Sequence, residues 1–530
     1  MAAETDGPVM PGLMMETPLL VRALAEHAER QFGEREVVGA TASAIQRSTW
    51  GEVVARARRL ASALRDLGVR PGDRVATFAT NSIPHLELYL AVPSMGAVLH
   101  TLNIRLFEDD LRYIVDHAED RIVFVEASLA DTMPRFARIE QEVVLPDGPG
   151  SRPGALDYES LIASGDPEFE FPDLDERAAA AMCYTSGTTG RPKGVVYSHR
   201  STVLHALLVS QGNVLGIDER DVLLPVVPMF HANAWGMPYA AAMTGSKLVL
   251  PGPRATGRPL AELIEAEAVT VAAGVPTIWL ELIALDPPPQ LSSLKRLLCG
   301  GSAVPRSLME AYDRRYGLRI EQAWGMTETS PVATSGKPPA LVSDPEETMR
   351  LRAAHGRPLP FVDMRIDAEA GGELQVRGPT VARAYYRDPD TDAKFTADGW
   401  LRTGDVAEQL DHGFIRLIDR TKDLVKSGGE WISSVSLENE IMAHPDVLEA
   451  AVVAVPDERW SERPCACVVR ASGSTLDADA LREFLAGRVA KWWLPERIEF
   501  IAAVPKTSVG KFDKKTLRSQ LADGALQSDG

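Results

Sequence analysis

The sequence predicts an α/β protein with a large N-terminal domain of doubly wound, mostly parallel sheets, a small β-rich subdomain and a smaller, mobile C-terminal α/β domain. Up to about residue 350, helix-like apolar stripes alternate with short apolar strands, as in doubly wound sheets. Beyond that point, shorter strands separated by Gly-containing turns indicate the β-rich subdomain. A charged connector then leads into the last helix-and-strand region.

The first part of the large domain shows this alternation clearly. Arg58–Leu67 places its apolar side chains on one helical stripe, and Gly68 can end that helix. Arg74–Ala79 is strand-like, Asp109–His117 is a second helix pattern, and Arg121–Glu126 is a second strand. Helix, turn and strand in this order predict parallel strands joined by helices.

The later part of the large domain repeats the pattern. Leu260–Ala268 and Thr277–Leu285 are predicted helices, and Val269–Ala273 and Leu294–Cys299 are predicted strands. The last strand leads directly into Gly300–Ala303. Ligands of such sheets bind beyond the carboxyl ends of the strands, so we expect a site at this glycine turn.

The connector Asp419–Asp423 carries four charged side chains between the apolar strands Phe414–Ile418 and Leu424–Val425. We expect one domain over residues 17–420, a second over 421–530, and a hinge at 420–423. The second domain should contain the following elements: strands at Ala450–Val455 and Cys465–Val469, helices at Asp477–Val489 and Lys514–Ala522, and a loop at Pro505–Lys511.

Composition narrows the class of protein. The chain has 530 residues, 45% hydrophobic and 25% charged, and a formal net charge of −18. An acidic surface disfavours nucleic acid and anionic membranes as main partners. No apolar run reaches the roughly 20 residues that span a bilayer. Glu4 and Asp6 stand where a signal peptide carries positive charge, and the four cysteines have no disulfide-framework spacing. These features predict a cytoplasmic protein, with Cys465 and Cys467 in a buried strand rather than a metal site.

The stretch Thr185–Lys193 is the strongest signal in the chain. Hydroxyl side chains and glycines fill Thr185–Gly190, and Lys193 follows almost at once. Converging backbone N–H groups, hydroxyls and a lysine favour a polyphosphate ligand, although a polar surface loop would have a similar composition. In a Walker loop the lysine precedes Ser or Thr and opens a helix. Here Lys193 lies between Pro192 and Gly194, so the pattern is not that of a P-loop kinase or ATPase.

Other segments carry groups that could complete a nucleotide site. Phe230–Gly236 contains a histidine and an indole, which could equally be core residues. Gln322–Thr329 contains one carboxylate, Glu328, which could bind Mg²⁺ together with substrate phosphates or act as a helix N-terminal charge. Asp405 could accept ribose hydroxyls or cap a turn. Lys511 follows Gly510 and could otherwise be a solvated surface charge.

Taken together and in this order, the motifs resemble those of the adenylate-forming acyl-CoA synthetases. The matching segments are Tyr184–Gly194, Gln322–Glu328, Arg402–Asp405, Asp419–Arg420 and Pro505–Lys511. The resemblance extends from about residue 17 to about residue 522, and it implies ATP, Mg²⁺ and coenzyme A as ligands. In the family reaction, a carboxylate attacks the α-phosphorus of ATP and releases pyrophosphate. The thiol of coenzyme A then takes the acyl group and releases AMP.

The resemblance also implies roles for individual residues. Those implied to be catalytic are Lys511, Lys193, Thr185, Glu328 and His231, with Thr185 and Glu328 near the metal ion. Those implied to bind ATP or AMP are Thr185, Ser186, Gly187, Thr188, Thr189, Gly190, Lys193, Gly301, Ser302, Ala303, Gln322, Ala323, Trp324, Gly325, Met326, Thr327, Asp405, Arg420, Lys422, Lys426 and Trp431. Those implied to line the acyl pocket are His231, Asn233, Trp235 and Gly236, and those implied to approach coenzyme A are Gly428, Gly429 and Glu430.

The acid is the least determined part of this prediction. Phe230–Gly236 and Ser427–Ser433 most closely resemble the medium- and long-chain fatty acyl-CoA synthetases, and small residues beside Trp235 leave room for an apolar tail. A short, substituted or aryl acid and a non-CoA adenylating enzyme are the alternatives. All of Lys193, Glu328 and Lys511 are present, which argues against an inactive relative. The fatty-acid branch often forms homodimers, so a homodimer is a further expectation.

Overall fold

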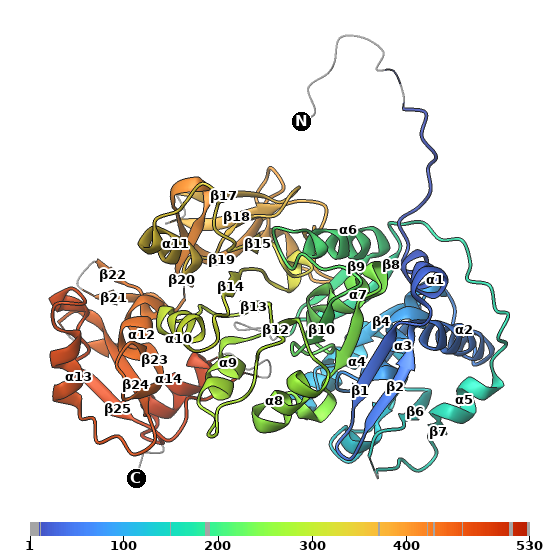
Figure 1. The fold of residues 1–530 in the computed structure, drawn as a ribbon, viewed down its shortest axis with the longest axis horizontal. Coiled ribbons are helices and arrows are strands. Elements are labelled where there is room, and N and C mark those ends of the chain that lie inside the picture. The colour runs from blue at the N-terminus through green and yellow to red at the C-terminus, as the bar shows by residue number, and fades with distance from the viewer. Residues whose placement is uncertain are drawn as a thin grey trace.

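The computed structural model describes residues 10, 12–148, 150–185, 191–368, 372–420, 422–427, 430–457, 459–507 and 512–526. Two seven-stranded sheets and their helices form the N-terminal domain, a four-stranded sheet forms the subdomain, and the C-terminal domain has its own sheet. Figure 1 shows the C-terminal domain at one end of the molecule and the strands β1–β7 at the other. The predicted architecture is confirmed.

The first large sheet has the strand order β7-β6-β5-β3-β4-β8-β9. Its strands are β3 (Arg74–Phe78), β4 (Val98–Thr101), β5 (Asp120–Glu126), β6 (Gln141–Leu145), β7 (Leu156–Asp157), β8 (Ala179–Tyr184) and β9 (Gly194–Ser198). All neighbours pair in parallel except β8 and β9, which are antiparallel. The carboxyl end of β8 therefore leads straight into the predicted phosphate loop.

The second large sheet has the order β14-β13-β12-β10-β11-β1-β2. Its strands are β1 (Glu36–Ala40), β2 (Ile45–Thr49), β10 (Val222–Pro225), β11 (Lys247–Leu250), β12 (Val271–Gly274), β13 (Arg296–Gly300) and β14 (Ile320–Ala323). Only the β1–β2 pair is antiparallel. The parallel strands β13 and β14 end beside one another, with Gly300 paired with Ala323, which brings the turn at Gly300 and the segment after Ala323 together.

Helices connect and cover these sheets. They are α1 (Val21–Phe32), α2 (Trp50–Asp66), α3 (Ile83–Ser94), α4 (Glu108–Ala118), α5 (Tyr158–Ser164), α6 (His199–Ser210), α7 (Met237–Thr244), α8 (Gly257–Ala266), α9 (Pro276–Ile283), α10 (Arg306–Tyr316) and α11 (Pro345–Arg352). Helix α2 begins earlier than the predicted Arg58, because Thr49 and Glu52 form a capping box. None of the described helices combines the length and apolar character needed to cross a membrane.

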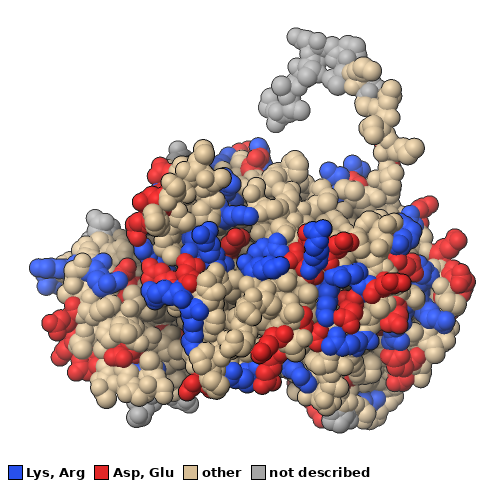
Figure 2. All heavy atoms as spheres, in the orientation of Figure 1, with Lys and Arg blue, Asp and Glu red and all other residues tan. Residues whose placement is uncertain are grey.

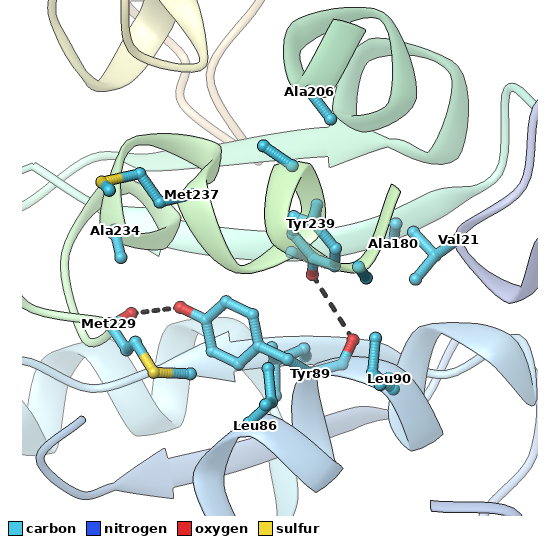
Figure 3. Close-up of a cluster of buried hydrophobic side chains, with 14 of the residues drawn as sticks. Val21, Leu86, Tyr89, Leu90, Ala180, Ala206, Met229, Ala234, Met237 and Tyr239 are labelled. Atoms are coloured by element: carbon cyan, nitrogen blue, oxygen red, sulfur yellow. Dashed lines mark hydrogen bonds between the residues drawn. The ribbon is translucent and has the colours of Figure 1, made fainter. Parts of the chain in front are cut away.

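The core of the N-terminal domain surrounds α3. Every residue of α3 is buried, as expected for a helix that is apolar on all sides. In Figure 3, Tyr89 of α3 and Tyr239 of α7 lie side by side, with their ring centroids 5.6 Å apart. The Tyr89 hydroxyl donates to the carbonyl of Met229, and the Tyr239 hydroxyl donates to the carbonyl of Tyr89 at 3.5 Å. These hydrogen bonds fix the segment before the acyl motif against α3.

The subdomain follows the second sheet. It contains the short pair β15 (Thr334–Ser335) and β16 (Arg357–Pro358), and the antiparallel sheet of β17 (Asp363–Asp367), β18 (Glu373–Arg377), β19 (Leu401–Gln409) and β20 (Ile415–Arg420). Strand β20 ends at Arg420, at the predicted hinge. On the face of the molecule shown in Figure 2, basic and acidic side chains are intermixed.

The C-terminal domain is built on the sheet order β22-β21-β24-β23, with β25 parallel to β24. Its elements are β21 (Val425–Ser427), β22 (Glu430–Ile432), α12 (Ser434–Met442), β23 (Val447–Asp457), β24 (Ser461–Arg470), α13 (Ala478–Leu485), β25 (Arg497–Phe500) and α14 (Lys514–Ala522). Cys465 and Cys467 are free and buried in β24, as predicted. The predicted helix at Asp477–Val489 is too long, because the chain leaves the helix after Leu485 and Gly487 has φ +90°.

Candidate nucleotide and acyl site

The predicted phosphate loop connects two antiparallel strands. Tyr184 of β8 pairs with Gly194 of β9, and the Thr185 N–H donates to the Lys193 carbonyl at 2.9 Å. Ser186, Gly187, Thr188, Thr189 and Gly190 lie outside the described residues. Because β8 is parallel to β4, the loop emerges at the edge of the sheet where strands of this kind place their ligands.

Lys193 is held by two residues that the sequence reasoning missed. Its Nζ lies 2.5 Å from Oδ2 of Asp388 and 5.1 Å from the ring centroid of Tyr385. The side chain of Lys193 is 28% exposed, so the ammonium group is still within reach of a ligand. The only signal for these partners is an aromatic pair followed by an acid in Tyr385–Asp388, which is common in surface turns.

Tyr385 also connects Lys193 to Glu328. The Tyr385 hydroxyl donates to Oε1 of Glu328 at 2.5 Å, and the Ala382 N–H donates to the Glu328 carbonyl. Burial raises the pKa of Glu328 above its usual range, and the hydrogen bond from Tyr385 opposes that rise. The structure thus brings two predicted site residues into contact with one tyrosine: Lys193 lies over its ring and Glu328 accepts from its hydroxyl.

The residues predicted to bind adenosine lie near the ends of β13 and β14. The Trp324 Nε1–H donates to Oδ2 of Asp405 at 2.9 Å, and Nε of Arg420 lies 3.1 Å from Oδ1 of the same carboxylate. Asp405 therefore has both oxygens engaged and is buried. Gln322 is also buried, and its Oε1 accepts from the Val304 N–H at 2.8 Å. That contact supports the turn containing Gly301, Ser302 and Ala303.

The acyl motif forms an unusual backbone turn. Ala232, Asn233, Ala234, Trp235 and Gly236 all have positive φ, at 43°, 52°, 47°, 56° and 74°. Four of these residues are not glycine, and a left-handed conformation costs such residues on the order of 1–2 kcal/mol each. The turn is kept in place by packing, since all five residues are buried.

His205 of α6 lies against this turn. A Cβ at Gly236 would lie 2.6 Å from Nδ1 of His205, so only glycine fits there. Nε2 of His205 accepts from the Val332 N–H at 3.0 Å, which places the ring proton on Nδ1. Burial lowers the pKa of His205 to about 3, so the ring is neutral. His205 lines a cavity of about 10 Å³ together with Tyr197, Thr202, Asn233, Gly236, Tyr239 and Ser330.

The remaining predicted residues are spread over both domains. His231 is half-buried just before the left-handed turn. Ala323 is the last residue of β14, and Gly325, Met326 and Thr327 follow the strand and lead to Glu328. Lys422 is exposed at the hinge, and Lys426 lies over the ring of Trp431 at 5.6 Å. The β21–β22 hairpin, which carries Lys426 and Trp431, lies far from the β8–β9 hairpin in Figure 1.

Some predicted residues cannot be placed. Gly428, Gly429, the side chain of Glu430 and Lys511 lie outside the described part of the chain. The ends of the Lys511 segment are described, since Lys506 and Phe512 form a β-bridge. Among the described residues, no group of three or more His, Cys, Asp or Glu side chains is placed to hold a metal ion.

Comparison with known proteins identifies the family. The family model for AMP-binding enzymes matches residues 24–386, and the model for the AMP-binding enzyme C-terminal domain matches residues 436–511. The chain is 42% identical to the medium-chain-fatty-acid–CoA ligase of Ectopseudomonas oleovorans, over 98% of this chain and 99% of that protein. It is 44% identical to the 3-methylmercaptopropionyl-CoA ligase of Ruegeria pomeroyi, over 97% and 99%.

A solved structure shows the same fold over nearly the whole chain. ATP-bound MatB from Rhodopseudomonas palustris superposes with a TM-score of 0.80 at 28% identity, covering 95% of this chain and 99% of that one. Lys193, Glu328 and Trp324 lie within the segment that matches the AMP-binding model, and Asp405 lies beyond its end. The chain therefore belongs to the AMP-binding enzyme family, and it is an acyl-CoA ligase of the adenylate-forming type.

Proposed function

We propose that this ligase activates an aliphatic carboxylic acid of medium or longer chain length, first as the acyl-adenylate and then as the thioester of coenzyme A. The observation that carries the proposal is the 42% identity to a medium-chain ligase over nearly the full length of both proteins. The buried apolar helices α3 and α7 behind the acyl turn agree with it, because an aliphatic tail needs an apolar surrounding.

In this proposal, Lys193 and the segment Thr185–Gly190 bind the β- and γ-phosphates of ATP. Asp388 is then the counter-ion that holds Lys193 until the phosphates arrive, since a lysine with one carboxylate partner and partial exposure can exchange that partner. Glu328 and Thr185 would hold Mg²⁺, and a single carboxylate fits an ion that takes its other ligands from phosphates and water. When bound, the ion neutralises phosphate charge.

The adenosine half of ATP is assigned to the groups at the ends of β13 and β14. Trp324 presents a flat indole to adenine, beside Gly301, Ser302 and Ala303. Asp405 and Arg420 bind the ribose hydroxyls. The hydrogen bond between Trp324 and Asp405 supports this assignment, because it fixes the indole plane before ATP binds.

The two steps require different parts of the C-terminal domain. Lys511 lies near the α-phosphate and the substrate carboxylate in the first step and stabilises the charge that develops there. The domain then rotates about the hinge 420–423, and Gly428–Glu430 approaches the pantetheine arm of coenzyme A. His231, Asn233, Trp235 and Gly236 line the acyl end of the site.

A panel of acids tests the chain-length assignment. The purified protein is given ATP, Mg²⁺, coenzyme A and one acid at a time, and release of AMP and pyrophosphate is measured. We expect kcat/KM to rise from acetate to a maximum at medium or longer aliphatic chains. A maximum at acetate or at an aromatic acid would contradict the chain-length proposal, and release of ADP or phosphate would contradict adenylate formation itself.

A second candidate is a short acid with a heteroatom in its tail. One observation favours it: the 44% identity to a relative named for 3-methylmercaptopropionate, over nearly the full length of both proteins. Comparing 3-methylthiopropionate with pentanoate separates the candidates, because the two acids differ by sulfur in place of one methylene. A preference for the thioether acid over every alkyl acid would establish the second candidate.

A further inference from the structure

The segment that carries Lys511 is fixed at both ends. Lys506 and Phe512 form a β-bridge, and the Asp513 N–H donates to the Pro505 carbonyl at 2.7 Å. Asp513 also caps α14 by accepting from the backbone N–H groups of Lys515 and Thr516. The described residues on both sides of the Lys511 segment are therefore tied to the start of α14, which begins at Lys514.

Lys514 enters a closed network beneath that helix. Its Nζ lies 2.7 Å from Oε1 of Glu438 and donates to Oγ of Ser434 at 2.5 Å. Both partners are on α12, and the side chains of Lys514 and Glu438 are only 12% and 8% exposed. The same Oε1 of Glu438 accepts from the Val452 N–H at 2.7 Å, which ties the pair to β23.

The network continues into the hinge. Oδ2 of Asp419 accepts from both the N–H of Ser434, at 2.7 Å, and its hydroxyl, at 2.5 Å. Oδ1 of Asp419 accepts from the Arg420 N–H at 2.7 Å. Ser434 thus links Lys514 directly to the residue that begins the charged connector.

A second cation of α14 holds the other side of the hinge. Arg518 lies one turn after Lys514, and both its Nη1 and its Nη2 lie within 3.0 Å of Oδ1 of Asp423. Residues four apart share one face of a helix, so α14 contacts both flanks of the connector, at Asp419 through Ser434 and at Asp423 directly. Buried ion pairs of this kind contribute little net stability but fix one geometry strongly.

We propose that Lys514 is a positioning residue for adenylation, which fixes the segment carrying Lys511 to α12 and to the hinge so that Lys511 and the hinge move as one body. The proposal rests on the proposed roles of Lys511 and of the hinge. Lys514 itself touches no substrate in this mechanism. Loss of Lys514 should displace Lys511, which only adenylation needs, whereas the connector keeps its contact between Arg518 and Asp423. Adenylation should therefore be impaired more than thioester formation.

The test compares the two half-reactions in matched variants. Lys514→Met is combined with Glu438→Gln, because glutamine keeps the acceptor for the Val452 N–H and removes the charge that would face the methionine. Asp419 keeps its hydrogen bonds from Ser434 and from the Arg420 N–H. Lys515→Met is the matched control, since Lys515 is the next residue and is exposed. Adenylation is measured as acid-dependent exchange of pyrophosphate into ATP, and thioester formation is measured from supplied acyl-adenylate and coenzyme A.

We expect the double variant to lose adenylation by roughly 10- to 100-fold, as misplacing a catalytic group by about 1 Å does, while thioester formation stays within about threefold of wild type. Lys514→Arg should restore part of the loss, Lys515→Met should change neither step, and Lys511→Ala sets the upper limit. Equal losses in both half-reactions, or none in either, would overturn the proposal.

A variant that does not fold and a failure of the proposed function can each be distinguished from a failure of the role proposed for Lys514. If the double variant does not fold, Lys514→Arg decides alone, because it keeps the charge and moves its position. A selective loss of adenylation in this variant supports the proposal. An equal loss in both steps, or no loss, overturns it. If wild-type protein shows no acid-dependent exchange, the proposed function has failed rather than the role of Lys514.

Discussion

Two lysines in this molecule each lie against a carboxylate, and their surroundings differ. Lys193, beside the phosphate loop, has its ion-pair partner Asp388 at 2.5 Å, and its side chain is 28% exposed. Lys514, beneath the hinge, lies 2.7 Å from Glu438 with a 12% exposed side chain and also donates to Ser434. An ion pair that is open on one side can exchange its partner for a ligand, whereas a buried pair within a closed network keeps its geometry. The difference supports the two roles that we propose, ligand binding for Lys193 and positioning for Lys514.

The largest effect is expected when Lys193 is removed from its partly exposed ion pair with Asp388. Lys193→Met should lower the adenylation rate by roughly 100- to 1,000-fold, because it removes a charge that stabilises the leaving pyrophosphate. Thermal stability should change little, since the pair is partly exposed. Lys295→Met, at an exposed lysine of the same domain, is the control. A large drop in Tm with an unchanged rate would reverse the roles that we assign to the two lysines.

The next effect concerns His355, a buried histidine that contacts β20, the strand that ends at the predicted hinge. Nδ1 of His355 accepts from the Leu417 N–H of β20 at 3.1 Å, and burial lowers the pKa of His355 to about 4 from 6.5. Between these two values the unfolded chain binds a proton that the native chain does not, so native stability falls as pH falls through this window. The loss at pH 4 should be roughly 3 kcal/mol.

Chemical denaturation at several pH values measures this dependence. His355→Asn keeps an acceptor near the Leu417 N–H and removes the titrating group, so its free energy of unfolding should depend less steeply on pH between about 4 and 6.5. Identical slopes for wild type and variant would show that His355 does not couple protonation to the strand that leads into the hinge.

The smallest effect concerns the hydrogen bond between Trp324 and Asp405, at the proposed adenosine site. Trp324→Phe keeps an aromatic face but removes the indole N–H that holds Oδ2 of Asp405. The KM for ATP should rise by about tenfold, as expected for a buried acceptor that loses one partner, and the KM for coenzyme A should stay unchanged. Steady-state kinetics with each substrate varied in turn measures both, and equal rises in the two values would indicate general damage.

The comparison also shows what sequence reasoning could find. Lys193, Glu328, Trp324 and Asp405 lie in motifs that predict a nucleotide site. The structure joins them in two pairs, Lys193 with Glu328 through Tyr385 and Trp324 with Asp405. Asp388 and Tyr385 were missed, because an acid and a tyrosine in a loop have no spacing that distinguishes a site from a surface turn. Their roles come from the pairing of distant segments: Tyr385 connects Lys193 with Glu328 across the subdomain.

The left-handed turn at Ala232–Gly236 is a second feature that the sequence does not predict. Local preference gives alanine and tryptophan no reason to adopt positive φ, and the cost is met only by packing against α6 and α7. His205, which lines the cavity beside that turn, lies in a helix whose pattern shows nothing unusual. The chemistry of the acyl end was therefore not readable from the sequence.

By itself, the sequence determined the fold class, the alternation of helices and strands and the acyl-CoA ligase family. These follow from local periodicity, turn residues and contiguous motifs, which act over a few neighbouring residues. The tertiary structure decided which lysines are open and which are enclosed, how Asp405 shares its two oxygens, and how α14 holds both flanks of the hinge. Those features depend on burial and on contacts between residues far apart in the chain, and both arise only when the sheets and domains pack.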